Sequence, residues 1–580
     1  MKIHASTVFA VFHFVLILGV AGAVGATMDF GAAIPAGATH AADAAATKGA
    51  AEPTGSAGAT GTDPAPGSTG AGAKGTVNGG GDEAGKAPAP GAASGDAAKP
   101  EDAGPPPEVL KEIEGQRRKA ARAAALKESA LSHPKELKYN TDWIAGLLEL
   151  GMLDEALAAA PTVAESFPGS PEASLLLGRT LARDGQFDLA RVQFQRAFGL
   201  DRTNAGAHSW SARMDLTHGD LESAEAGFRK ALAIDPAFKD ARVQLASLLE
   251  RTGRYSEAIS VLRRQPGAAE QGKKEAAEAA PEFEGRWGLL DQFVKNPPVV
   301  VPAGFKGVTV PFRTTRGYPP LVTVKLADGV DRLFVVDTGS DEAVLTPEAA
   351  KALGLPSKGK TTIRDNKGQE HPTPAWVVLD TLTLGDLTVA RVPARVSPGL
   401  RYPVEEIAGS LGRDFLRRFR PVLDYSNKTL TLSRPDGPAL QGVPFDLMGA
   451  ILLEGFNGDH DLGKFALDTS SYTPGALDFD LVGRETGLTL FDKEVRVIPE
   501  GPYLFKFTMP SLKVADVEFR NFAATAVDLR SLGNQLGVRI RGIVGNSLLR
   551  GCRLEIDFRN QRLSLKKVVE TRPPEATPGA

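Results

Sequence analysis

The chain contains 580 residues, of which 24% are charged, and its formal net charge at pH 7 is −3. Because this charge is small for such a length, we expect no nucleic-acid or other polyanionic partner. Cys552 is the only cysteine, so the fold cannot depend on intrachain disulfides. The length leaves room for two or more domains beside the low-complexity sequence.

The first residues, 1–26, have the pattern of a secretory signal peptide. Met1-Lys2 precedes an apolar stretch from Val8 to Ala26, and the small residues at 21–23 or 24–26 fit a cleavage site. The stretch is also long enough to remain as a membrane anchor if it is not cleaved, and only then do we expect membrane contact. Together with the richness in Ala, Gly and Arg, this signal predicts an exported protein of the bacterial periplasm, the cell envelope or the medium.

Residues 27–107 are dominated by Ala, Gly and Pro with scattered charges. Such sequence buries too little apolar surface to offset the entropy of ordering, so we expect a disordered linker. Residues 108–137 predict a charged helix. A second linker is predicted at 268–298 and a disordered tail at 569–580.

A 34-residue period runs through residues 138–267. Glycine and alanine both recur at this interval, at Gly151, Gly185, Gly219, Gly253, Ala156, Ala190, Ala224 and Ala258. The pattern resembles the tetratricopeptide repeat, in which small residues let the two helices of each unit pack closely. The resemblance implies an all-α superhelix whose concave face binds a peptide or a protein partner; a packing spacer is the alternative. We expect these repeats to form an independent domain joined to the rest through the mobile second linker.

An apolar strand that ends in an aspartate occurs twice in the carboxy-terminal half. Residues 333–340 read Leu-Phe-Val-Val-Asp-Thr-Gly-Ser, and residues 464–471 read Lys-Phe-Ala-Leu-Asp-Thr-Ser-Ser. Further pairs recur at a fixed offset of 133 residues: Gly409 and Gly542, Gly412 and Gly545, Asp424 and Asp557. This is an internal duplication, so two similar lobes are expected.

Each copy is expected to be rich in β-strands. Alternating or apolar runs predict strands at 322–326, 376–379, 382–384, 429–432, 505–507 and 562–565. Thr346-Pro347 fits the start of a short helix and Gly354 its end. The polar stretch 364–370 fits the tip of a mobile β-hairpin. The corresponding stretch of the second copy, 497–503, is richer in proline and is expected to be a more rigid wall of its lobe.

Together these features resemble the retropepsin-like aspartic proteases. The resemblance rests on residues 335–340, 343–355, 407–416 and 422–425, and in the second copy on 540–549 and 554–558. It implies a bilobal, mostly-β acid-protease domain after the helical repeats, with lobe one at 299–440 and lobe two at 441–568. Retropepsins usually assemble their site by homodimerisation. Because both lobes lie in one chain here, the site is expected within a monomer.

In this family the mechanism needs one aspartate from each lobe. The resemblance implies that Asp337 and Asp468 form a dyad that shares one proton and activates the water that hydrolyses a peptide or protein substrate. Thr338 and Thr469 would join the two loops by hydrogen bonds. The expected activity is that of an aspartic endopeptidase.

The remaining loop positions differ between the copies. Ser340 and Ser471 are expected to bond the outer carboxylate oxygens. Gly339 has the residue typical of the family, whereas Ser470 stands where the family has glycine. A Cβ at that position is expected to crowd the loop or the substrate, or to require a strained, positive φ.

Two other interpretations stay open. A degenerate second lobe would leave a noncatalytic pseudoprotease that binds peptides or proteins. If only lobe one were active, it would have to dimerise with lobe one of another chain to complete the site. The sequence contains no zinc-ligand spacing, no cysteine nucleophile with a histidine partner and no phosphate-binding loop. We therefore expect no metal and no cofactor.

Overall fold

The computed structural model describes residues 107–263, 289–314, 319–355, 362–364, 370–372, 375–397, 407–471, 473, 475–485 and 505–568. The predicted signal peptide, the tail and the wall at 497–503 lie outside these residues, as does nearly all of the first linker. Within the described part, no helix is both long and apolar enough to cross a membrane. The described residues from Lys119 onward belong to one compact unit.

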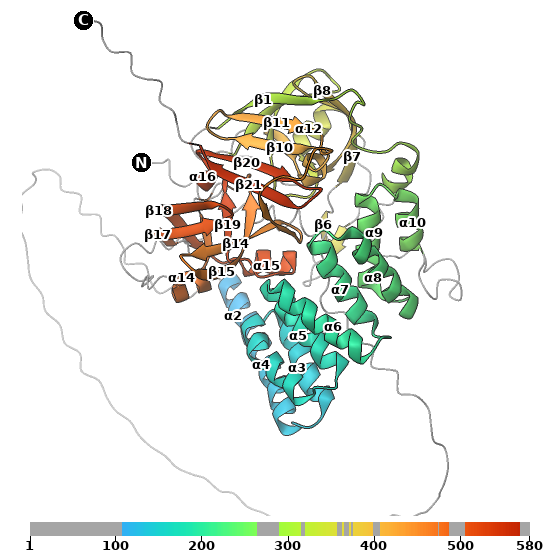
Figure 1. The fold of residues 1–580 in the computed structure, drawn as a ribbon, viewed down its shortest axis with the longest axis vertical. Helices are drawn as coiled ribbons and strands as arrows, with labels where there is room; N and C mark the ends of the chain where they lie inside the picture. Colours follow the sequence, from blue (N-terminus) through green and yellow to red (C-terminus); the bar gives the residue numbers. More distant parts are fainter. Residues whose placement is uncertain are drawn as a thin grey trace, which may run out of the picture. The chain divides into compact units, whose positions relative to one another are not determined.

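The amino-terminal part of this unit is helical (Figure 1). After α2 (Pro107–Ser132), the helices are α3 (Leu137–Leu150), α4 (Leu153–Ser166), α5 (Pro171–Asp184), α6 (Phe187–Leu200), α7 (Ala205–Thr217), α8 (Leu221–Ile234), α9 (Lys239–Arg251) and α10 (Tyr255–Arg263). From α3 onward they pack as successive pairs. The turn inside each pair contains one of the periodic glycines in the left-handed region, with φ of 74° at Gly151, 89° at Gly185, 85° at Gly219 and 78° at Gly253.

Small residues let the paired helices approach closely. The four periodic alanines are fully buried. A Cβ at Gly178 in α5 would lie 2.4 Å from a ring carbon of Phe194 in α6, so a larger residue would separate these two helices. Within the described residues, the 34-residue period therefore corresponds to four helix pairs, from α3–α4 to α9–α10.

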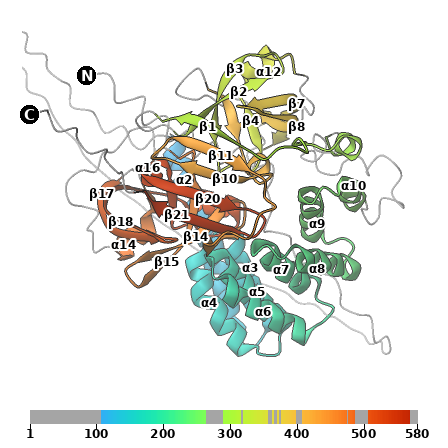
Figure 2. The same cartoon turned by 45° about the horizontal axis from the view of Figure 1, so that its top comes forward.

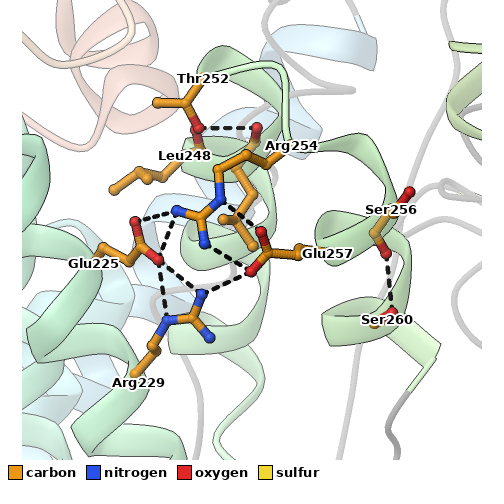
Figure 3. Close-up of polar contacts among 9 residues, drawn as sticks. Glu225, Arg229, Leu248, Thr252, Arg254, Ser256, Glu257 and Ser260 are labelled. Carbon is orange, nitrogen blue, oxygen red and sulfur yellow. Dashed lines mark hydrogen bonds and ion pairs between the residues drawn. The ribbon is translucent and has the colours of Figure 1, made fainter. Parts of the chain in front are cut away.

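Ion pairs join the last two helix pairs at their surface. Figure 3 shows that Arg229 and Arg254 both contact Glu225 and Glu257, with N–O distances from 2.6 to 3.1 Å. Because these side chains are partly exposed, each pair contributes little alone. The shared contacts link α8 to α10 as a network.

The carboxy-terminal part of the unit is mostly β. Lobe one contains β1 (Gly307–Arg313), β2 (Leu321–Leu326), β3 (Asp331–Val336), β4 (Ala343–Leu345), α12 (Pro347–Ala352), β5 (Thr362–Arg364), β6 (Glu370–Pro372), β7 (Ala375–Leu384), β8 (Leu387–Val396), β9 (Ile407–Leu411), α13 (Arg413–Leu416), β10 (Arg420–Asp424) and β11 (Thr429–Ser433). The two strands expected at 376–379 and 382–384 form one strand, β7. As predicted, the Thr346 side chain caps α12 by accepting from the amide of Ala349.

Lobe two repeats this arrangement. Its elements are β12 (Val443–Pro444), β13 (Asp446–Leu447), β14 (Ile451–Asn457), β15 (His460–Asp468), β16 (Ala476–Asp478), α14 (Phe479–Glu485), β17 (Phe505–Val514), β18 (Val517–Val527), α15 (Arg530–Leu536), β19 (Gly542–Gly545), α16 (Asn546–Leu549), β20 (Cys552–Asp557) and β21 (Arg562–Lys567). Figure 2 shows the strands of both lobes from a second direction.

The duplication is visible in the strand order. Lobe one has the order β2-β3-β9-β4-β8-β7, closed by pairing of β7 with β2, and lobe two has β14-β15-β19-β16-β18-β17, closed by pairing of β17 with β14. The lobes meet in one sheet of order β12-β21-β20-β10-β11-β1. At its centre, β10 and β20 are antiparallel, with Leu423 opposite Leu554. Each lobe is thus a closed barrel-like sheet, and their last strands hold the two together.

The helical repeats do not form the independent domain that we expected. Residues 289–295, which were predicted to lie in the second linker, are helical, and Leu289, Leu290 and Phe293 pack with α7–α10. The same apolar cluster includes Trp376 of β7. The repeats therefore share buried surface with lobe one.

Candidate active site

The two predicted aspartates follow equivalent strands. Asp337 comes directly after β3, and its amide donates to the carbonyl of Leu411 at the end of β9, at 3.1 Å. Asp468 ends β15 and lies opposite Gly545 of β19. Both pairs of strands are parallel, so each aspartate emerges at the same place in its lobe.

Reciprocal hydrogen bonds join the two aspartate loops. The amide of Thr338 donates to Oγ1 of Thr469, and the amide of Thr469 donates to Oγ1 of Thr338, both at 3.0 Å. Each hydroxyl in turn donates across the lobe boundary, Thr338 to the carbonyl of Leu467 at 3.1 Å and Thr469 to that of Val336 at 2.7 Å. Both threonines are fully buried. The structure thus brings the two loops together within one chain, as the sequence predicted.

Asp337 is surrounded by donors from its own loop. Its Oδ1 accepts the amides of Gly339 at 2.9 Å and Ser340 at 3.0 Å, and its Oδ2 accepts the hydroxyl of Ser340 at 2.8 Å. Ser340 therefore has the contact expected of it. Three donors directed at one side chain suit an ionised acceptor.

Asp468 has a different set of contacts. Its Oδ1 accepts both the amide of Ser470 at 2.8 Å and the hydroxyl of Ser470 at 2.6 Å. Its Oδ2 is buried and has no hydrogen-bond partner in the described part of the chain. The expectation that Ser471 bonds this carboxylate is wrong, because its hydroxyl lies 2.9 Å from that of Thr473.

The residue after each threonine explains part of this asymmetry. A Cβ on Gly339 would lie 2.6 Å from Oδ1 and from Cγ of Asp468, so only glycine fits there. Ser470 occupies the equivalent position in lobe two, and its side chain is fully buried. It is not among the described residues with positive φ, so the strained backbone that we expected is not present. The loop accommodates the side chain by using its hydroxyl as a donor to Asp468.

Burial and a neighbouring charge perturb the second aspartate. Asp468 is only 2% exposed and Asp337 is 4% exposed. Burial and, after it, the charge of Asp337 raise the pKa of Asp468 to about 7, although the donors of Ser470 act in the opposite direction. The pair thus contains a carboxyl that is protonated at mildly acidic pH next to one that is held by three donors.

A buried arginine, which we did not predict as a site residue, supports the first loop. Arg413 is 3% exposed and donates to the carbonyl of Thr338, to Oδ1 of Asp341 and to the carbonyl of Gly449, each at 2.6 Å. It therefore ties the loop of lobe one to lobe two. Its equivalent in the second copy is Asn546, so the position was visible in the sequence as an arginine present in one copy only.

Other residues repeated in the two copies have structural roles, and the predicted hairpin lies partly outside the described residues. A Cβ on Gly412 would lie 2.1 Å from the carbonyl oxygen of Glu342, which explains the glycine behind the first loop. Asp424 accepts both the amide and the side chain of Asn427, as expected of a structural carboxylate. Strands β5 and β6 form the expected antiparallel hairpin, whose tip at 365–369 is not described. Across the described residues, no cluster of three or more His, Cys, Asp or Glu could hold a metal ion.

Comparisons with known proteins agree with this architecture. Residues 322–415 match the family model of aspartyl proteases. The chain has an aspartyl protease-like region. The match lies within lobe one, and the duplicated strand order extends the same fold to lobe two. Residues 215–280 match the tetratricopeptide repeat. The chain is therefore multidomain, with tetratricopeptide-like helices followed by a β-rich, retropepsin-like region.

Individual relatives resemble only parts of the chain. A retropepsin-like aspartic protease from Rickettsia conorii is 21% identical, covers 22% of this chain and 92% of its own, and has a TM-score of 0.18. MamA 41-end from Desulfovibrio magneticus RS-1 is 20% identical, covers 27% of this chain and 89% of its own, and has a TM-score of 0.22. A probable biofilm formation methyltransferase, WspC, of Pseudomonas putida is 32% identical over 119 residues, which are 20% of this chain and 27% of that protein. None of these similarities assigns an activity to the aspartyl protease-like region.

Proposed function

We propose that the protein is an aspartic endopeptidase whose dyad, Asp337 and Asp468, forms within a single chain. The observation that carries this proposal is the reciprocal bonding of Thr338 and Thr469, which holds the two aspartate loops against each other. The raised pKa of Asp468 supports it, because a shared-proton mechanism needs one carboxyl that stays protonated while its neighbour is ionised.

The contacts favour a fixed division of roles. Asp337 accepts three hydrogen bonds and acts as the base that takes a proton from the attacking water. Asp468 carries its proton on Oδ2, the oxygen without a protein partner, and donates to the oxyanion that develops on the scissile carbonyl. In the collapse of the tetrahedral intermediate, the C–N bond breaks and the proton taken by Asp337 passes to the leaving amine. As the carbonyl re-forms, the proton returns to Asp468.

The test is hydrolysis of a diverse peptide library by the purified full chain, with and without pepstatin. We expect the cleavage rate per protein molecule to be independent of protein concentration. Both Asp337→Asn and Asp468→Asn should abolish cleavage. If only Asp337→Asn abolished cleavage, and the rate per protein molecule rose with concentration, the site would instead be formed by a dimer of first lobes.

A noncatalytic peptide-binding protein is the second candidate, and Ser470 favours it. This residue fills the place of the glycine that the family has in each loop, and both aspartates are nearly inaccessible. Failure of the parent chain to cleave any library member between pH 3 and pH 8, with retained peptide binding, would select this candidate.

We further propose that the repeats recruit a protein substrate or partner and that the chain is exported to the bacterial periplasm, envelope or medium. The match to the tetratricopeptide family supports the first proposal, and the apolar pattern of residues 1–26 supports the second. Deletion of residues 2–26 should retain a fusion reporter in the cytoplasm. If the reporter is exported regardless, the signal assignment is wrong.

A further inference from the structure

The turns of three successive helix pairs contact lobe two. Each turn contains a periodic glycine in the left-handed region, and a side chain of lobe two lies against each one. A Cβ on Gly151 would be 3.6 Å from the amide nitrogen of Asn534, one on Gly185 would be 2.7 Å from Cγ of Lys464, and one on Gly219 would be 2.6 Å from Oε1 of Gln561. The fourth turn, at Gly253, has no such neighbour within 4 Å among the described residues.

Hydrogen bonds and charges accompany the glycine contacts. The amide of Arg539 donates to the carbonyl of Arg183 at 2.6 Å, and the side chain of Gln561 donates to the carbonyl of Thr217 at 2.8 Å. The guanidinium of Arg539 lies 3.0 Å from Asp184 in α5 and 2.9 Å from Asp154 in α4. Arg539 is thus a residue of lobe two whose charge is matched by two carboxylates of the repeats.

The contacted surface includes the strand that ends in Asp468. Along β15, Phe465 and Leu467 point into the main core that the two lobes share, whereas Ala466 belongs to an apolar cluster with Phe187 of α6. Lys464, on the same face as Ala466, has its ammonium 4.9 Å from the centre of the Phe187 ring. One face of this strand therefore packs on the lobe, and the other packs on the repeats.

The same helical array reaches lobe one at its other end. Trp376 of β7 is buried in a cluster with α7–α10. Arg251 at the end of α9 also acts on Asp341, which follows the first aspartate loop. The Asp341 side chain is exposed, and the charges of Arg413 and then Arg251 lower its pKa. The repeats thus contact both lobes, and on lobe two they contact the strand that ends in Asp468.

We propose that the edge of the repeat array formed by the glycine turns is an intramolecular docking surface, which braces the strand carrying Asp468 and sets its position relative to Asp337. The proposal rests on the proposed function for its consequence in catalysis. The claim that the repeats stabilise β15 does not rest on the proposed function, because it concerns only how well ordered that strand is. In this view Arg539 is a positioning residue: it contacts the repeats and not the substrate.

The test uses a charge exchange in the full chain. Arg539→Glu places a carboxylate against Asp184 and Asp154, and Asp184→Arg in the same chain restores an opposite pair. Arg530→Ala is the matched control, because Arg530 pairs with Asp528 inside lobe two, at 2.6 Å. Arg539→Gln removes the charge without repulsion and serves if the glutamate variant does not fold.

The first readout is amide hydrogen exchange of residues 460–468. We expect Arg539→Glu to speed exchange there by about 2-fold to 100-fold, the range of pairwise coupling energies, and the double variant to reverse most of this change. Arg530→Ala should leave the segment unchanged. The proposal would be overturned if Arg539→Glu and Arg539→Gln increased exchange in α5 and α6 but left exchange in β15 unchanged.

The second readout is peptide cleavage. A brace predicts that kcat falls in Arg539→Glu with little change in KM, and that Asp184→Arg restores it. If the parent chain cleaves no peptide, the proposed function fails, while the exchange experiment still decides whether the repeats brace the strand. If cleavage is normal in Arg539→Glu although β15 exchanges faster, the positioning role is refuted.

Discussion

Asp468→Asn is expected to stabilise the protein at alkaline pH while it abolishes activity. In the folded chain the pKa of Asp468 is raised to about 7 from its ordinary value of 3.8, mainly by burial. An acid with a raised pKa binds its proton more tightly in the folded state, so its ionisation opposes folding. The penalty is absent below pH 4, grows as the pH rises towards 7, and is constant above that. Asparagine carries no charge and removes the penalty.

The size of the effect follows from the shift. Three pKa units at about 1.4 kcal/mol each correspond to about 4 kcal/mol, which is an upper limit because the proton is shared with Asp337. The asparagine oxygen can keep the bonds from Ser470, and its amide then takes the place of Oδ2. The variant should therefore gain as much as about 4 kcal/mol at pH 8.5 and nothing at pH 4.

Thermal unfolding of the full chain at pH 4, 6 and 8.5 measures this difference. We expect a higher midpoint temperature for Asp468→Asn at pH 8.5, a smaller gain at pH 6, and coincident curves at pH 4. Asp516→Asn, which changes an exposed carboxylate of the same lobe, should show no such dependence. A gain that is equal at all three pH values, or absent at pH 8.5, would show that Asp468 is not a protonated buried acid.

Three further predictions concern the same loops. The cleavage rate should fall as the pH rises through about 7, because Asp468 then loses its proton. Ser470→Ala should move this fall to higher pH, because the donors of Ser470 lower the pKa of Asp468. An unchanged pH–rate profile in Ser470→Ala would contradict the assignment. Thr338→Ala removes two bonds across the lobe boundary and should lower the unfolding free energy by about 1–3 kcal/mol, whereas Thr338→Ser should lose far less in the same denaturant titration. Gly339→Ala should abolish cleavage, because its methyl group would meet the Asp468 carboxylate. Gly304→Ala, whose methyl group would meet nothing within 4 Å, should cleave at the parental rate. An active Gly339→Ala variant would refute the packing argument.

Much of this fold could be predicted because its signals are local and repeated. A 34-residue period of glycine and alanine needs only the geometry of a helix pair, and an apolar run before Asp-Thr predicts a buried strand with a polar turn. The fixed offset between the copies predicted two lobes, and the strand order has the same symmetry. Such patterns do not depend on how distant segments meet.

The errors came from contacts that the sequence does not encode locally. Ser470 and Ser471 are adjacent, and which hydroxyl reaches Asp468 depends on the path of the loop, so the donor was assigned to the wrong serine. Arg539 and Gln561 have the character of solvent-exposed residues on a lobe surface, and only the folded chain shows that they contact the repeats. Arg413 was part of a recognised motif, but its three acceptors come from two separate segments, residues 338–341 and Gly449.

The joining of both lobes in one polypeptide has a chemical consequence. In a homodimer every substitution appears twice, so a serine beside one aspartate would also stand beside the other, and by symmetry each side chain would press on the opposite carboxylate. Here Gly339 leaves room for Asp468, while Ser470 supplies a hydroxyl that only Asp468 uses. Covalent fusion thus lets selection act on each half separately. Two carboxyl groups that begin as equivalents can then acquire different contacts and a different acidity.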